Sequence, residues 1–128
     1  MTLLLDTHAL LWWVMADPRL SATARERIRD PQNTVLVSSA SGLEITTKHR
    51  LGKLEFREWD PMTLPAVLRK DRMETLAVSL EHALRAGSLQ GPHRDPFDRM
   101  LIAQSRIEGL PIVTRDPVFQ AYGVNVIW

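Results

Sequence analysis

Apolar residues occur along the chain in short runs that polar, turn-forming segments separate. The first run, Thr2 to Leu5, is followed by a stretch over 7–15 that is too densely apolar for a surface helix, which predicts a buried strand and then a largely buried helix. After the turn-forming residues 30–33, the β-branched segment 34–37 predicts a second buried strand. We therefore expect buried strands and helices to alternate.

Caps and helix breakers mark the other elements. Asp95 and Pro96 open the best-defined helix, because Asp is a preferred N-cap and Pro is tolerated at the first helical position, and Gly109 closes it. The remaining expected elements are helices from Ser21, over 40–50 with Gly52 as terminator, from 61–64, over 79–86 and from Asp116, and strands over 75–78, 111–114 and 124–128. Apolar strands that alternate with helices predict a mainly parallel sheet covered on both faces.

Length and composition narrow the classes of protein. The chain has 128 residues, enough for one hydrophobic core, so we expect a single domain over 1–128. Its 16 Lys and Arg nearly balance its 15 Asp and Glu, so any nucleic-acid site must be a local basic patch. The absence of cysteine excludes thiolate metal sites and suits a cytoplasmic protein, and the apolar stretch 9–16 is too short to span a membrane.

Four acidic residues occupy comparable positions in this pattern. Asp6 ends the first strand, Glu44 lies in the helix after the second, Asp98 lies in the first turn of the helix that opens at Asp95, and Asp116 follows the fourth strand. Parallel strands place their carboxyl ends at one edge of a sheet, where ligands bind in such folds, so we expect the four acids to converge there. Carboxylate clusters suit Mg²⁺ or Mn²⁺ and phosphodiester hydrolysis by metal-activated water.

Each acid also has an ordinary structural interpretation. Asp6, Asp95 and Asp116 each lie where an N-cap would, and capping is the favoured role for Asp95. Asp98 could be the acidic partner of that cap, and Glu44 could pair with Lys48 one helical turn later. The functional interpretation therefore depends on the convergence of the acids and on no single residue.

Several segments carry a family resemblance when taken in order. They are Leu4 to His8, Ser38 to Ile45, Arg50 to Leu54, His93 to Arg99, Thr114 to Asp116 and the terminal Trp128. Together they resemble the PIN-domain ribonucleases of the VapC type, the toxins of type II toxin–antitoxin systems. One departure is Gly42-Leu43 before Glu44, where similar sequences often have tryptophan, and a glycine weakens a helix interior.

This resemblance implies a fold, an activity and partners. The fold would be a three-layer α/β/α sandwich, and the activity that of an Mg²⁺- or Mn²⁺-dependent endoribonuclease cleaving tRNA or rRNA. Asp6, Glu44, Asp98 and Asp116 would be the catalytic acids; Asp6, Asp98 and Asp116 would hold metal, and Glu44 would hold metal or orient the attacking water. The resemblance further implies a homodimer and a cognate antitoxin that occupies a groove near the active site, for which exposed apolar residues within 59–68 are candidate contacts.

Basic and hydroxyl side chains near these motifs are candidate substrate-binding residues. Thr7 could donate its hydroxyl to phosphate, and Lys48, Arg50, Arg94 and Arg99, with His49, Lys53 and His93, could form a basic rim for RNA. The structural alternatives are a plain helix cap for Thr7 and solvated surface charge for the others. The four histidines show no pairing one helical turn apart, so a zinc site is not expected.

Two other functions remain as alternatives. The first is a PIN fold that has lost catalysis and only binds RNA or protein. The second is a receiver-like Mg²⁺-binding signalling domain, which would need a second acid beside Asp6 and an aspartate at the end of a middle strand. Neither is present, since the strands that end near Val37 and Val78 have no terminal aspartate.

Overall fold

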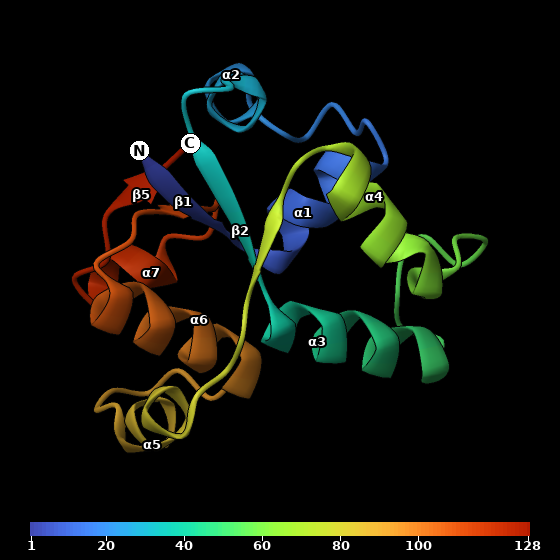
Figure 1. Ribbon diagram of the computed structural model, residues 1–128. Helices are drawn as coiled ribbons and strands as arrows, with labels where there is room; N and C mark the ends of the chain where they lie inside the picture. Colours follow the sequence, from blue (N-terminus) through green and yellow to red (C-terminus); the bar gives the residue numbers. More distant parts are fainter.

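The computed structural model describes residues 1–128 and is built on a five-stranded sheet (Figure 1). The strands are β1 (Thr2–Leu5), β2 (Thr34–Ser38), β3 (Glu74–Leu76), β4 (Ile112–Val113) and β5 (Val126–Ile127). All neighbouring pairs are parallel, and their order is β3-β2-β1-β4-β5. Strands β2 and β3 are therefore added on one side of β1, and β4 and β5 on the other side. The order of the strands reverses at β1, so its carboxyl end is the topological switch point of the sheet.

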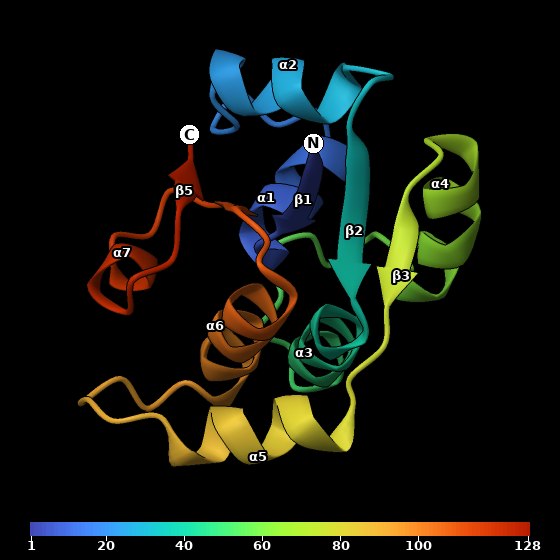
Figure 2. The same cartoon turned by 60° about the vertical axis from the view of Figure 1, so that its left-hand side comes forward.

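Helices cover both faces of the sheet and its carboxyl edge. They are α1 (Thr7–Val14), α2 (Ala22–Arg29), α3 (Ser39–Arg50), a 3₁₀ turn η1 (Pro61–Thr63), α4 (Leu64–Lys70), α5 (Leu80–Ser88), α6 (Pro96–Glu108) and α7 (Val118–Ala121). Figure 2 shows α2 at the opposite end of β2 from α3, which begins where β2 ends. No helix combines the length and apolarity that a membrane crossing would require.

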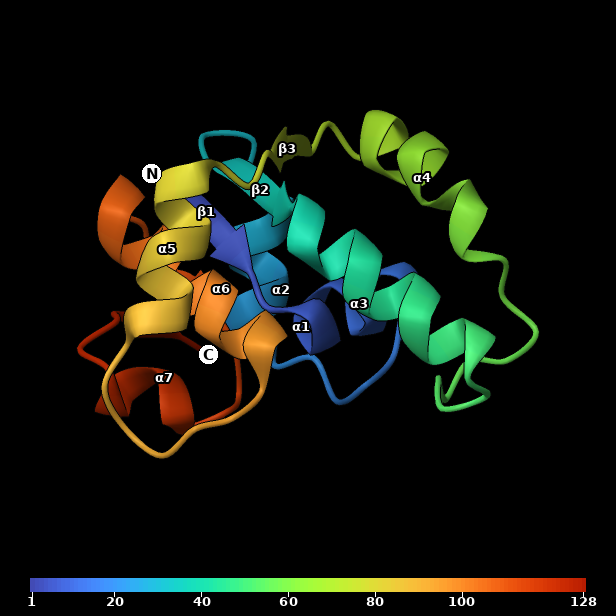
Figure 3. The ribbon, with the colours of Figure 1, turned by 90° about the horizontal axis from the view of Figure 1, so that it is seen from below.

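Alternate residues of β1 face two separate hydrophobic cores. Leu3 and Leu5 pack in the larger core with residues of α1, α2 and α4, whereas Leu4 packs in the smaller core with residues of α6 and α7. Helix α5 lies against α6 (Figure 3). These contacts give a three-layer α/β/α sandwich with a wholly parallel sheet, which confirms the predicted α/β class.

Side-chain caps explain where several helices begin. The hydroxyls of Ser21 and Ser38 accept backbone N–H groups at the starts of α2 and α3. The carboxylate of Asp95 accepts the N–H groups of Phe97 and Asp98, and Gly109 ends α6 in the left-handed conformation at φ 66°. The predicted capping role of Asp95 is therefore confirmed, and α6 has the predicted start and end.

Some element boundaries differ from those predicted. Strand β3 starts one residue earlier than predicted and stops at Leu76. Strands β4 and β5 are only two residues long, which is shorter than the predicted ranges 111–114 and 124–128. Helix α5 continues through Gly87 to Ser88, past the predicted end at Ala86. A tertiary contact accompanies this extension: the guanidinium of Arg99 on α6 donates hydrogen bonds to the carbonyls of Ala86 and Gly87 at the end of α5.

Candidate active site

The carboxyl edge of the sheet brings the four predicted acids toward one region. Seen from below, α1, α3 and α6 surround the end of β1, and these elements carry or adjoin three of the acids (Figure 3). Asp6 connects β1 to α1, Glu44 lies in the middle of α3, and Asp98 lies in the first turn of α6. Asp116 lies between β4, which pairs with β1, and α7.

Asp6 is buried at the N-cap position of α1, but its side chain makes no capping hydrogen bond. Its Oδ2 instead accepts a hydrogen bond from Oγ1 of Thr114 at 2.8 Å. The same Thr114 oxygen accepts the N–H of Asp116 at 3.0 Å. Thr114 therefore links the acid after β1 to the acid after β4, and the simple capping interpretation of Asp6 is wrong.

Asp116 does act partly as a cap. Its Oδ1 accepts the N–H of Val118 at 3.0 Å, at the start of the short helix α7. The residue is nevertheless exposed, and its side chain lines the same hollow as Asp6. Its second carboxylate oxygen has no hydrogen-bond partner within the chain, so Asp116 can serve both as a turn former and as a ligand.

Glu44 is buried within α3, with only 3% of its surface exposed. Oε2 accepts a hydrogen bond from Nζ of Lys48 at 2.5 Å, so the predicted pairing one turn apart does form. Oε1 is buried and has no hydrogen-bond partner. A buried carboxylate oxygen without a donor is unfavourable, and a cation or a water molecule at this position would relieve that cost.

Asp98 is half-buried beside the loop that precedes α6. Its Oδ2 lies 2.9 Å from Nε2 of His93, and the two groups form a hydrogen bond. Asp95 has already capped the helix, which leaves the carboxylate of Asp98 free to face the site. His93 thus fixes the orientation of one of the four acids.

Burial and neighbouring negative charge raise the pKa values of two of these acids. Burial, together with the charges of Glu44 and Asp116, raises the pKa of Asp6 to about 6, although the Thr114 hydrogen bond opposes the shift. Burial and the charges of Asp95, Asp6 and Glu44 raise the pKa of Asp98 to about 6, although the hydrogen bond from His93 opposes it. Carboxylates from α3, α6 and the β1–α1 junction therefore act on one another electrostatically.

The acids form an open site and not a closed metal cage. No three Asp, Glu or His side chains lie close enough to coordinate one ion directly. Two adjoining hollows reach three of the acids: one of 370 Å³ is lined by Asp6 and Asp116, and one of 220 Å³ is lined by Glu44, whereas Asp98 lines neither. This openness fits Mg²⁺ or Mn²⁺, because Mg²⁺ commonly takes one or two carboxylates and keeps several waters.

The predicted substrate-binding residues have different surroundings. Thr7 is buried and its hydroxyl hydrogen-bonds that of Ser41 at 2.9 Å, while Lys48 is bound to Glu44. Arg50 and Arg94 are exposed. Arg99 is half-buried, and its guanidinium donates to the carbonyls of Ala86, Gly87, Leu89 and His93, so it holds the α5–α6 loop instead of forming part of a solvated rim.

Sequence reasoning missed the roles of three residues that the structure places at the site, although His93 was predicted as part of the basic rim. Thr114 bridges two acids, His93 orients a third, and Arg115 lies in the hollow with Asp6 and Asp116. A hydroxyl residue at the end of a buried strand, two positions before an acid, was an available signal for Thr114. No local pattern indicates the position of Arg115, because that position depends on Trp12 from a distant element.

The fold has clear counterparts among solved structures. VapBC2 from Rickettsia felis bound to a DNA fragment from their promoter has a TM-score of 0.70 at 17% identity, over 98% of this chain and 97% of that one. DNA-bound VapBC from Salmonella typhimurium has a TM-score of 0.70 at 20% identity, over 98% of this chain and 96% of that one. VapC20 from Mycobacterium tuberculosis, a sarcin-ricin loop cleaving toxin, has a TM-score of 0.65 at 19% identity, over 95% of each chain. No curated protein matches the chain by sequence.

The parallel sheet and the buried acids at its switch point place this chain among the α/β proteins that have an acidic site suited to binding a cation. Within that class, the PIN domain family model matches residues 3–125. The chain belongs to the PIN domain family. The predicted membership of the PIN domain family is thereby confirmed, and the chain shares its fold with solved VapBC and VapC structures.

Proposed function

We propose that this chain is a metal-dependent endoribonuclease that acts as the toxin of a toxin–antitoxin pair, with residues 1–128 forming one nuclease domain. The observation that carries the proposal is the set of mutually repelling carboxylates at the sheet edge, where the pKa values of Asp6 and Asp98 rise to about 6. Membership of the PIN family and the likeness in fold to VapC20, a sarcin-ricin loop cleaving toxin, support it. The proposed substrate is tRNA or rRNA.

Mg²⁺ or Mn²⁺ fits the residues present. Asp6, Asp98 and Asp116 would hold the ion directly or through water, and Glu44 would contribute the oxygen that has no partner. When bound, a divalent ion supplies a water with a lowered pKa and neutralises charge on the phosphate. An oxygen-only site of this kind suits hard cations.

The protein's own side chains orient the acids for this reaction. Thr114 fixes one oxygen of Asp6, His93 fixes one oxygen of Asp98, and Lys48 fixes one oxygen of Glu44. In each carboxylate the other oxygen remains available to the site. Glu44 can orient the attacking water through Oε1, and water attack forms no covalent enzyme intermediate and needs no 2′-hydroxyl.

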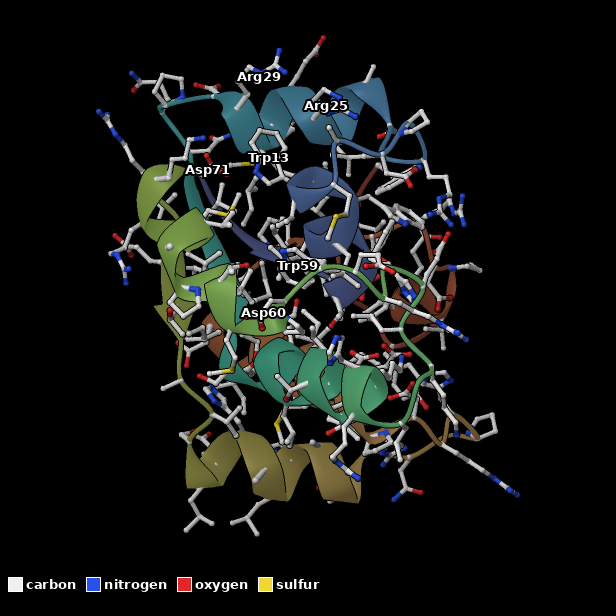
Figure 4. All side chains as sticks on the ribbon, turned by 90° about the vertical axis from the view of Figure 1, so that its right-hand side faces the viewer. Trp13, Arg25, Arg29, Trp59, Asp60 and Asp71 are labelled. Carbon is white, nitrogen blue, oxygen red and sulfur yellow. The ribbon has the colours of Figure 1, made fainter.

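An antitoxin protein is the proposed partner, and a homodimer the proposed assembly. Figure 4 shows Trp13 and Trp59 on the face that α2 and α4 border, and the indole N–H of Trp13 donates to Asp71 at 2.9 Å. Leu64 and Leu68 are buried, so Met62, which is 75% exposed, is the candidate apolar contact from the 59–68 region. Light scattering on the purified chain tests the dimer, because a dimer has twice the mass of one chain.

The function is tested by incubating purified, partner-free protein with total RNA in Mg²⁺, Mn²⁺ or EDTA. We expect discrete products with metal, none with EDTA, and at least a ~100-fold loss in Asp6→Asn, since removing a metal ligand removes its charge stabilisation. Glu26→Gln is the matched control, because Glu26 is exposed on α2 and should leave cleavage unchanged. If folded wild-type protein binds RNA without cleaving it under any metal, the binding-module alternative replaces this proposal.

A further inference from the structure

Two hollows adjoin at the acidic site and share part of their lining. The 370 Å³ hollow contains Asp6, Asp116, Arg19 and Arg115. The 220 Å³ hollow contains Thr7, Glu44, Lys48 and Lys53. His8, Trp12 and Glu55 line both hollows, so these three residues form the boundary between them. Each hollow therefore combines at least one of the proposed catalytic acids with basic residues.

The basic residues in the two hollows differ in whether a carboxylate neutralises them. Arg19 forms ion pairs with Asp17 and Glu55, both at 2.8 Å. Lys48 forms its ion pair with Glu44. Arg115 and Lys53 are exposed and form no ion pair. Each hollow thus holds one lysine or arginine whose charge remains available to a ligand.

Trp12 positions the free guanidinium of Arg115. The guanidinium carbon lies 4.6 Å from the centroid of the buried Trp12 ring, and the Trp128 ring packs against the same indole at 5.9 Å. A cation–π contact of this kind orients a guanidinium while leaving its in-plane N–H donors free. Those donors suit a phosphate, whose oxygens accept two parallel hydrogen bonds from one arginine.

We propose that Arg115 binds a backbone phosphate of the RNA strand in the hollow beside Asp6 and Asp116, and that Lys53 binds a second phosphate in the adjoining hollow. This proposal rests on the proposed ribonuclease function. The strand crosses the boundary formed by His8, Trp12 and Glu55, whose carboxylate is paired with Arg19, and so presents a phosphodiester to the acids of both hollows. Arg115 and Lys53 counter the repulsion between the acids and the RNA backbone.

The test measures RNA binding over a range of salt concentrations in Asp6→Asn protein, which holds substrate without cleaving it. The variants Arg115→Gln and Lys53→Gln are added singly and together, with Arg29→Gln as control. Arg29 is exposed on α2, at the other end of the sheet, and makes no ion pair (Figure 4). Each site variant should weaken binding about tenfold at low salt and reduce the slope of log K against log salt by about 1, additively in the double variant.

Arg115→Lys separates phosphate binding from a structural role of the stacked arginine. Lysine keeps the charge, so Arg115→Lys should retain the slope of log K against log salt while its affinity for RNA falls. Arg115→Gln should show both a smaller slope and a lower affinity. With otherwise wild-type protein, Arg115→Gln should raise KM more than it lowers kcat. If wild-type protein cleaves RNA but the slope of Arg115→Gln equals that of Arg29→Gln, the inference is overturned and the ribonuclease stands. If wild-type protein neither binds nor cleaves RNA, both proposals fall.

Discussion

At the scale of single residues, Asp6 shows how the site opposes the stability of the fold. It is buried at the end of β1, and the negative charges of Glu44 and Asp116 act on it. One hydrogen bond from Thr114 offsets only part of that cost, since the pKa of Asp6 still rises to about 6. An ionised Asp6 therefore destabilises the protein when no cation is bound.

This cost predicts a pH-dependent effect of Asp6→Asn in EDTA. The folded pKa of about 6 lies above the ordinary value of 3.8, so the folded state binds the proton more tightly and stability falls as pH rises between these values. At pH 7 the penalty is fully present and amounts to at most about 3 kcal/mol. Asparagine removes the charge but can still accept the Thr114 hydrogen bond.

Chemical denaturation at pH 7 and pH 4 checks the prediction. Asp6→Asn should be more stable than wild type at pH 7, and the difference should shrink toward pH 4, where wild-type Asp6 is protonated when folded. Lower stability of Asp6→Asn at pH 7 would show that the carboxylate is not strained by burial.

At the scale of elements, the connection between α5 and α6 depends on Arg99. Four carbonyls from residues 86–93 converge on its guanidinium. The segment they hold ends at His93, which in turn contacts Asp98. A side chain on α6 therefore orders the loop that orients one of the acids.

We expect Arg99→Gln to loosen this loop selectively. Glutamine cannot reach four acceptors, so backbone amides over 87–94 should exchange with solvent roughly tenfold faster, while amides in β1 and the core of α6 keep their protection. Hydrogen exchange read by mass spectrometry measures both sets. Arg106→Gln, an exposed change on the same helix, is the control, and equal exchange in the two variants would contradict the role assigned to Arg99.

At the scale of the whole molecule, the strand order decides which acids meet. Because β1 lies between β2 and β4, residues 6, 44 and 116 reach one edge although up to 110 positions separate them in the chain. The coupling between Asp6 and Asp98 adds α6 to the same site. Any ion that binds there is therefore linked to the folding of the entire sheet.

Metal should consequently offset the difference in stability between wild type and Asp6→Asn that we predict in EDTA. A ligand at 100 times its Kd stabilises a fold by roughly 2.7 kcal/mol, so Mn²⁺ or Mg²⁺ should raise the Tm of wild-type protein and raise that of Asp6→Asn much less. Thermal unfolding over a metal titration measures the effect, with Ca²⁺ as a comparison ion. Equal shifts in both proteins would place metal binding away from Asp6.

The sequence by itself determined the local features of this protein. The two buried strands β1 and β2, the Asp95 cap and the Gly109 terminator follow from apolar runs and from backbone preferences of neighbouring residues, and all of them form. The four acids could be selected because a strand-end rule applies to parallel sheets in general. Their positions were predictable, although their individual hydrogen-bond partners were not.

Only the tertiary structure decided how those residues are used. Thr114 bridges Asp6 and Asp116, Arg99 holds the α5–α6 loop, and Arg115 stacks on Trp12. Each depends on contacts between groups from different elements, and the length of a side chain or its charge does not specify such a partner. The pKa values of Asp6 and Asp98 are likewise set by burial and by distant charges, which exist only once the sheet has brought its strand ends together.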